Sequence, residues 1–228
     1  MPRSFLPRVW DAVKPPPPLP ARRRLNRSQG RLIRGTVVVV VLGASAWGVY
    51  AWIASAPDRA LNYFMKGNSL LGPGDFRGAA AQFTKAIEVS PKFAEAYRAR
   101  GDAWQKAGQS DAALADFEKA IAIDPGDWLA YISRGMLWRS RGDSQRALAD
   151  FARSIQLHPT ADAYYQRGLT NQALGEAEGA VDDYGRAIER DPGAPYAYRA
   201  RAKAKRDLGD MAGAKEDQET AERVEKTK

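Results

Sequence analysis

Cysteine is absent from this chain of 228 residues, and His158 is its only histidine. Without cysteine there is no disulfide and no thiolate chemistry, so the composition does not indicate a redox compartment. His158 stands directly before Pro159 with no neighbouring set of ligands, and we interpret it as a solvated turn residue. The acidic pair Asp182 and Asp183 has no histidine, cysteine or phosphate loop to complete a catalytic site. We therefore predict a protein that is not an enzyme and uses no cofactor, metal or small-molecule substrate.

Acidic residues are nearly absent from residues 1–34, which hold nine basic side chains and one acid, Asp11. The other residues carry 26 basic and 26 acidic side chains, so the net charge of +8 comes from this N-terminal segment. A neutral remainder has no basic stripe of the kind that nucleic acids require, and we predict no nucleic-acid partner. Residues 1–34 are predicted to form a basic, proline-rich, largely disordered tail.

Within the tail, Pro17, Pro20 and Arg22 form the P-x-x-P-x-R pattern of SH3 ligands. Patterns of this kind arise often in proline-rich linkers, so a stiff polyproline II spacer is the alternative interpretation. The pattern alone does not separate a ligand from a spacer.

Charged residues are entirely absent from residues 35–56, a run of 22 positions. About 20 apolar residues suffice for a helix to cross the hydrocarbon core, and Tyr50 and Trp52 suit a headgroup belt. We predict a single transmembrane helix over residues 35–56. A cleaved signal peptide is one alternative, because residues 54–56 form an A-x-A pattern, and a mitochondrial presequence is another, because residues 1–34 are rich in arginine.

The charges that flank this run predict its orientation. Nine cations precede it, whereas Asp58 and Arg59 cancel each other directly after it. The positive-inside rule then keeps the N-terminal tail in the cytoplasm and exports the C-terminal region. We expect a single-pass protein of the inner (plasma) membrane with residues 57–228 in the periplasm.

Beyond the hydrophobic run, one pattern of residues recurs four times. Gly67, Gly101, Gly135 and Gly168 are separated by steps of 34, 34 and 33 residues. After each glycine come a small residue, an aromatic ring, a second small residue and a proline: Ala79/Phe83/Ala86/Pro91, Ala113/Phe117/Ala120/Pro125, Ala147/Phe151/Ser154/Pro159 and Ala180/Tyr184/Ala187/Pro192. This pattern resembles that of the tetratricopeptide repeat (TPR) family, whose signature is W-x2-L-G-x2-Y, A-x3-F and P with a period of 34.

The resemblance implies an all-α fold in which each repeat is a helical hairpin and the hairpins stack into a solenoid. Small residues then lie where paired helices touch, aromatic rings fill the seam, and proline ends the second helix. A fifth unit, from about Pro195, has Ala202 in place of glycine and Gln218 in place of the ring, as in a polar capping repeat. We predict that residues 57–228 form four TPR repeats and a degenerate capping repeat. The layout is similar to that of membrane-anchored bacterial TPR proteins.

Two charges also recur with the pattern. An arginine precedes the glycine position in the second to fifth repeats, and an aspartate follows 16 residues later: Arg100/Asp116, Arg134/Asp150, Arg167/Asp183 and Arg201/Asp217. Because both charges recur together, we predict a structural ion pair between packed helices rather than a catalytic or anion-binding ladder.

In the resembled family, partners bind side chains of each repeat's first helix that face the concave groove. Carried over by distance from each glycine, four positions of each first helix face the groove: Leu61, Phe64, Asn68 and Leu71; Glu95, Arg98, Asp102 and Gln105; Leu129, Ile132, Met136 and Arg139; Asp162, Tyr165, Leu169 and Gln172; and Tyr196, Arg199, Lys203 and Arg206. Among these groove positions, the predicted partner-binding residues are Phe64, Asn68, Arg98, Asp102, Ile132, Met136, Arg139, Tyr165, Leu169, Arg199 and Lys203. An apolar centre with cations toward the C-terminal end suits an amphipathic helix or an extended peptide. We expect a membrane-anchored adaptor or scaffold that binds protein partners during complex assembly, secretion or envelope processes. A constitutive structural subunit of a membrane complex is the alternative.

Overall fold

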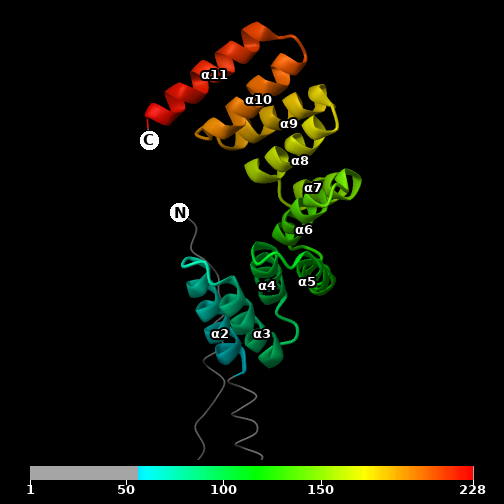
Figure 1. Ribbon diagram of the computed structural model, residues 1–228, viewed down its shortest axis with the longest axis vertical. Helices are drawn as coiled ribbons and strands as arrows, with labels where there is room; N and C mark the ends of the chain where they lie inside the picture. The colour runs from blue at the N-terminus through cyan, green and yellow to red at the C-terminus, as the bar shows by residue number, and fades with distance from the viewer. Residues whose placement is uncertain (1–55, 228) are drawn as a thin grey trace, which may run out of the picture. The chain divides into compact units, whose positions relative to one another are not determined.

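The computed structural model describes residues 56–227, and every regular element among them is an α-helix (Figure 1). The helices are α2 (Ala56–Leu71), α3 (Phe76–Val89), α4 (Ala94–Lys106), α5 (Ser110–Ile123), α6 (Trp128–Ser140), α7 (Ser144–Leu157), α8 (Ala161–Ala173), α9 (Ala177–Arg190), α10 (Pro195–Asp207) and α11 (Met211–Lys226). They pair in chain order into five hairpins, α2/α3 to α10/α11. This confirms the predicted all-α TPR solenoid.

Each hairpin turns at a glycine that holds a left-handed backbone. In the third repeat this residue is Gly142, with φ of 81°. The amide of the next residue, Asp143, donates to the carbonyl of Trp138 at 3.0 Å, which closes the end of α6 as in a Schellman motif. The carboxylate of Asp143 then accepts from the amide of Arg146 and caps the start of α7. One short loop therefore ends one helix and begins the next.

The glycines that mark the period lie where the two helices of a hairpin cross. A Cβ added to Gly135 would lie 2.7 Å from Cε1 of Phe151, and the other three glycines face an aromatic ring of their own repeat in the same way. In the fifth repeat Ala202 is buried at this position, and Gln218 replaces the ring. The predicted role of small residues at the crossing is thus confirmed, and the larger alanine occurs where the ring is missing.

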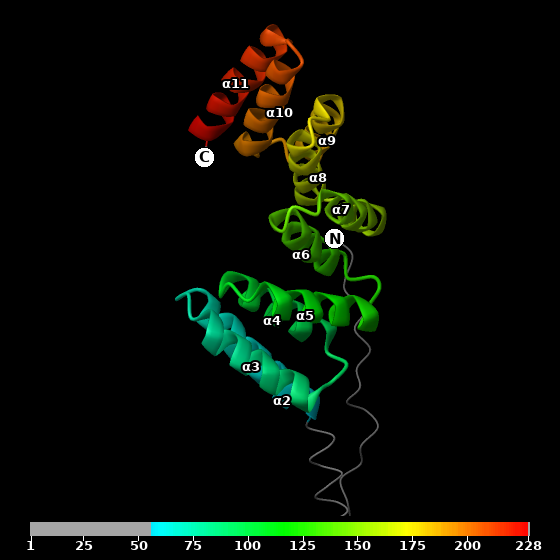
Figure 2. The ribbon, with the colours of Figure 1, turned by 45° about the vertical axis from the view of Figure 1, so that its right-hand side comes forward.

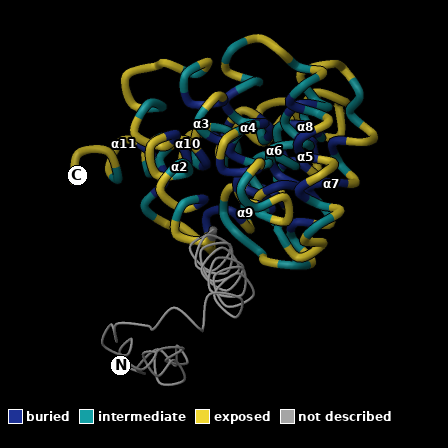
Figure 3. The backbone as a smooth tube through the Cα atoms, turned by 90° about the horizontal axis from the view of Figure 1, so that it is seen from below, coloured by how far each residue is buried: buried dark blue, intermediate teal, exposed yellow. Residues whose placement is uncertain are grey.

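Successive hairpins stack through contacts of α3 with α4, α5 with α6, α7 with α8 and α9 with α10 (Figure 2). The first helices of neighbouring repeats also touch, α2 with α4 and so on to α8 with α10. The first helices thus form one continuous side of the stack. Burial follows the shared helix faces, while loops are exposed (Figure 3).

The N-terminal predictions fall largely outside the described part of the chain. The tail, residues 1–34, and the predicted transmembrane helix, residues 35–56, lie there apart from Ala56, where α2 begins. Within residues 56–227, no helix is both long enough and apolar enough to cross a membrane.

Candidate functional site: the groove lined by the first helices

The residues predicted to line the groove all lie on the first helices of the repeats, α2, α4, α6, α8 and α10. Their exposure differs widely along the stack. Asn68, Arg199 and Lys203 are exposed, Ile132 is buried, and Phe64, Arg98, Asp102, Met136, Arg139, Tyr165 and Leu169 are half-buried. The structure therefore brings these residues to one side of the stack, but not all of them are accessible to a partner.

Ile132 was predicted to line the partner-binding groove, but the structure buries it. Its relative exposure is only 4%, and it packs with Ala147, Phe151 and Ala163 in a hydrophobic cluster. Ala163 lies on α8, so the next repeat covers Ile132. Ile132 stabilises the stack and is not accessible to a partner.

Two of the predicted cations are already paired within the chain. Arg98 Nε lies 2.9 Å from Oδ2 of Asp127, whose other carboxylate oxygen accepts from the first amides of α6. Arg199 forms an ion pair with Glu225 of α11. These arginines join α4 to α6 and α10 to α11, so their charges are partly neutralised before any partner binds.

Arg139 differs from both, since it forms no ion pair with any residue in the range 56–227. Its Nη1 donates to the carbonyl oxygen of Gln166 at 3.2 Å, and burial lowers the pKa of its guanidinium. Next to it, the ring of Tyr165 lies 5.7 Å from that of Tyr184, tilted by 47°, and packs edge-on at 4.8 Å against Tyr196. A cation with spare donors thus lies beside an aromatic cluster whose outermost ring, Tyr196, is 43% exposed.

A pocket of about 380 Å³ opens between α2, α4 and α6, lined by Leu71, Asp102, Gln105, Lys106, Ser133 and Met136. Asp102 and Met136 are among the predicted partner-binding residues, and Leu71 and Gln105 also occupy groove positions. Lys106 and Ser133 were missed because they lie outside the four positions carried over from each family repeat. Burial raises the pKa of Asp102, although a hydrogen bond with Ser133 and the charge of Arg98 oppose the shift.

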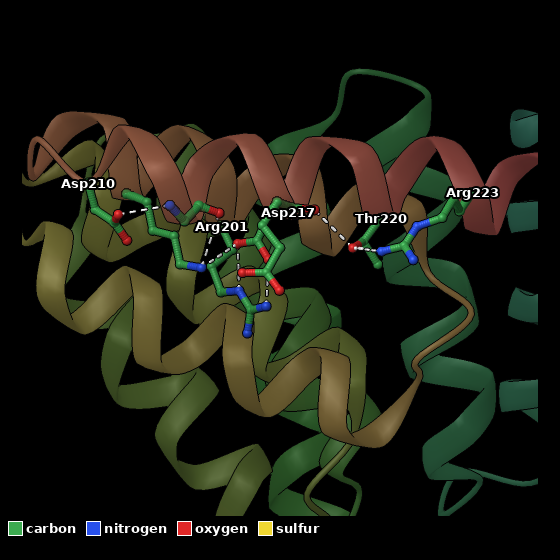
Figure 4. A network of polar contacts seen from close by, with 8 residues as sticks. Arg201, Asp210, Asp217, Thr220 and Arg223 are labelled. Carbon is green, nitrogen blue, oxygen red and sulfur yellow. Dashed lines mark hydrogen bonds and ion pairs between the residues drawn. The ribbon is translucent and has the colours of Figure 1, made fainter.

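The repeated arginine and aspartate form a ladder of ion pairs between the two helices of the second to fifth hairpins. Figure 4 shows the last pair, in which Arg201 on α10 points at Asp217 on α11. Nε and Nη2 of Arg201 donate to the two carboxylate oxygens at 2.8 and 2.7 Å. The four aspartates, Asp116, Asp150, Asp183 and Asp217, are buried, so the prediction of structural pairs is confirmed.

Asp217 also forms an ion pair with Lys205, whose Nζ lies 2.9 Å from Oδ2 of Asp217. Burial opposes its ionisation, but the hydrogen bonds and charges of Arg201 and Lys205 outweigh this and lower the pKa of Asp217. Because the pKa is lowered in the folded state, the network contributes stability above the unfolded value of about 3.9. This contribution is lost as the pH falls through the lowered pKa.

The first repeat has neither residue of the pair: Lys66 replaces the arginine and Gln82 replaces the aspartate. Loss of one partner alone would leave a buried charge uncompensated, so the joint replacement is physically consistent. In the other four repeats, a tyrosine stands three positions before each arginine. The centroid of its ring lies 5.5 to 5.8 Å from the guanidinium carbon of that arginine; these tyrosines are Tyr97, Tyr131, Tyr164 and Tyr198. The arginine is therefore held between a carboxylate and a ring, and it belongs to the framework rather than to the groove.

Among solved structures, one of MamA matches 71% of this chain and 95% of its own length, with 26% identity and a TM-score of 0.64. PilF of Pseudomonas aeruginosa matches 75% of this chain and 78% of its own, with 16% identity and a TM-score of 0.70. YrrB, described as "a TPR protein with an unusual peptide-binding site", covers 72% of this chain and 86% of its own, with 22% identity and a TM-score of 0.58. The last two identities establish a shared fold alone. Among curated proteins, none matches the sequence.

The family model described as tetratricopeptide repeat matches residues 64–127, 105–164 and 134–195. These overlapping matches run over more than half of the chain and coincide with the stacked hairpins α2/α3 to α8/α9. The chain therefore belongs to the tetratricopeptide repeat family.

Proposed function

We propose that this protein is a membrane-anchored adaptor whose groove binds a peptide or an amphipathic helix of a protein partner. The observation that carries the proposal is the exposure of large apolar side chains on the first helices. Leu61, Leu129 and Tyr196 are 49%, 36% and 43% exposed at groove positions, although Phe83, Phe117, Phe151 and Tyr184 already fill the seams. Exposed apolar residues along one face are typical of a contact surface.

The charges of the groove fit the same function. Arg139 offers unpaired donors beside Tyr165, and Lys203 is exposed toward the C-terminal end. A bound segment would then bury apolar side chains on Leu129 and Tyr196 and place carboxylates or carbonyls near the cations. The proposal is supported by YrrB, a fold relative that is described as having a peptide-binding site.

The groove can be tested with the full chain in detergent micelles, panned against a random peptide library on phage. The wild type is expected to enrich peptides with apolar residues, and Leu129→Glu with Tyr196→Glu should reduce their binding at least tenfold. A matched control is Leu174→Glu with Leu208→Glu, because these residues are 44% and 43% exposed but lie at the helix ends outside the groove positions. Equal loss in both double variants would contradict a groove-specific site. A stable stoichiometric membrane complex without peptide selection would favour the structural-subunit alternative.

The anchor and its orientation form a second part of the proposal. They are supported by the uncharged run of residues 35–56 and by the nine basic residues before it against a single acid. The full-length protein is expected to stay in the membrane through carbonate washing with residue 1 retained. A reporter that works only in the cytoplasm should be active when fused before Arg22 and inactive after Lys228. Release of a soluble form that starts at Pro57 would contradict the anchor, and reversed reporter activity would contradict the orientation.

A further inference from the structure

The pocket between α2, α4 and α6 combines apolar walls with a single half-buried carboxylate, that of Asp102. Leu71 and Met136 supply the apolar surface, and Gln105 and Ser133 supply neutral polar groups. A volume of about 380 Å³ is large enough for one long side chain but too small for a folded element. Asp102 lies on α4, the middle of the three helices that line the pocket.

The two cations near Asp102, those of Arg98 and Lys106, contact other groups. Arg98 is paired with Asp127 at 2.9 Å. The ammonium group of Lys106 lies 5.6 Å from the centroid of the Phe76 ring, in the preceding repeat. Ser133 lies close enough to favour the ionised form of Asp102, and Asp102 has no ion pair within residues 56–227. Within the described residues, the charges of Arg98 and Lys106 therefore act on Asp102 only from a distance, and its carboxylate has no ion-pair partner.

We infer that this pocket accepts a lysine or arginine side chain of the bound partner, with the cation on Asp102 and the methylene stem between Leu71 and Met136. The inference rests on the proposed function, because it names the anchor residue of the peptide in the groove. Lysine and arginine side chains bury an apolar stem and form strong hydrogen bonds with carboxylates through the charged end. The pocket supplies both an apolar surface and a carboxylate. A neutral or acidic side chain would leave the carboxylate of Asp102 buried without a counter-ion.

The raised pKa of Asp102 is in keeping with this role. Its pKa is raised in the folded chain, so the ionised carboxylate opposes folding at neutral pH. Replacement by the neutral, isosteric asparagine is therefore expected to leave the melting temperature unchanged or to raise it. A residue that costs stability yet faces an open pocket is typical of a binding site. Loss of binding in Asp102→Asn would then not be due to unfolding.

The test uses the full chain in detergent micelles and a positional-scanning peptide library. The wild type is expected to select lysine or arginine at one position, and Asp102→Asn should lose this selection while other positions keep theirs. Glu95→Gln is the matched control, since Glu95 is an exposed acid on the same helix and at a groove position. For the best peptide, changing the selected arginine to neutral citrulline should weaken wild-type binding about tenfold or more and leave Asp102→Asn binding unchanged.

The outcomes separate the inference from the function on which it rests. Peptides selected without a basic position, or a basic preference that survives in Asp102→Asn, would overturn the pocket assignment but leave the groove function intact. A basic preference lost equally in Glu95→Gln would also overturn it, because the attraction would then be diffuse. Selection of no peptide at all by the wild type would overturn both.

Discussion

Replacing Arg167 with methionine is expected to lower the free energy of unfolding by about 3 kcal/mol, since this removes one partner of a buried ion pair. Asp183 is 1% exposed and would keep only the amide of Asn171, which donates to it at 2.9 Å. The figure is at the lower end for such changes because the Arg167 side chain is 28% exposed and partly solvated. Urea denaturation of the full chain in detergent, followed by circular dichroism at 222 nm, measures the change.

A matched control is available on the neighbouring surface of α9. Arg186 and Asp182 form an exposed ion pair at 3.8 Å, so Arg186→Met should cost no more than about 0.5 kcal/mol. Combining Arg167→Met with Asp183→Leu should restore most of the lost stability, because no buried charge remains. If Arg167→Met costs as little as Arg186→Met, the repeated pairs do not hold the hairpins together.

The period of the sequence predicted the helical hairpins because each repeat must solve the same packing problem. A ring such as Phe151 reaches across to the partner helix, and only a residue without a side chain fits beneath it at Gly135. The ion pairs were predictable for the same reason, since each of the four repeats with a buried aspartate also requires the arginine. Features that recur are constrained by the fold, and their role can be derived from recurrence.

The groove was predicted less well because its residues differ from repeat to repeat. Arg98, Ile132 and Tyr165 occupy the same position in successive repeats, where the base of the side chain is covered by the next hairpin. Arginine and tyrosine are long enough to extend past this cover, whereas isoleucine ends within it and is buried. Exposure at this position thus depends on the length of the side chain, which distance from the glycine does not encode.

The pocket at Asp102 was also not predictable as a pocket. Asp102 was expected in the groove, but Ser133 and Lys106 come from neighbouring positions whose directions depend on the angle between α4 and α6. That angle is set by packing between repeats rather than by any single motif. The sequence pattern placed the carboxylate of Asp102 on the correct helix face. The pocket around it forms only when α2, α4 and α6 stack.

Ile132→Glu is expected to lower the free energy of unfolding by about 3 kcal/mol or more. The substitution removes a buried aliphatic side chain and places a carboxylate among Ala147, Phe151 and Ala163, where no cation is available in the cluster. Because Ala163 belongs to α8, the change should loosen the contact between the third and fourth repeats as well as the third hairpin. Urea denaturation and hydrogen exchange of the α6 and α8 amides measure both effects.

Leu129→Glu provides the comparison, since Leu129 lies on α6 three residues earlier and is 36% exposed against 4% for Ile132. It introduces the same charge on the same helix, but at the surface, and should change stability by less than about 0.5 kcal/mol. Binding of groove-selected peptides should nevertheless weaken, because the substitution adds a charge to the apolar contact surface. If both variants unfold alike, Leu129 is part of the core. If neither does, Ile132 is accessible, and the separation between the packed seam and the binding face of α6 is incorrect.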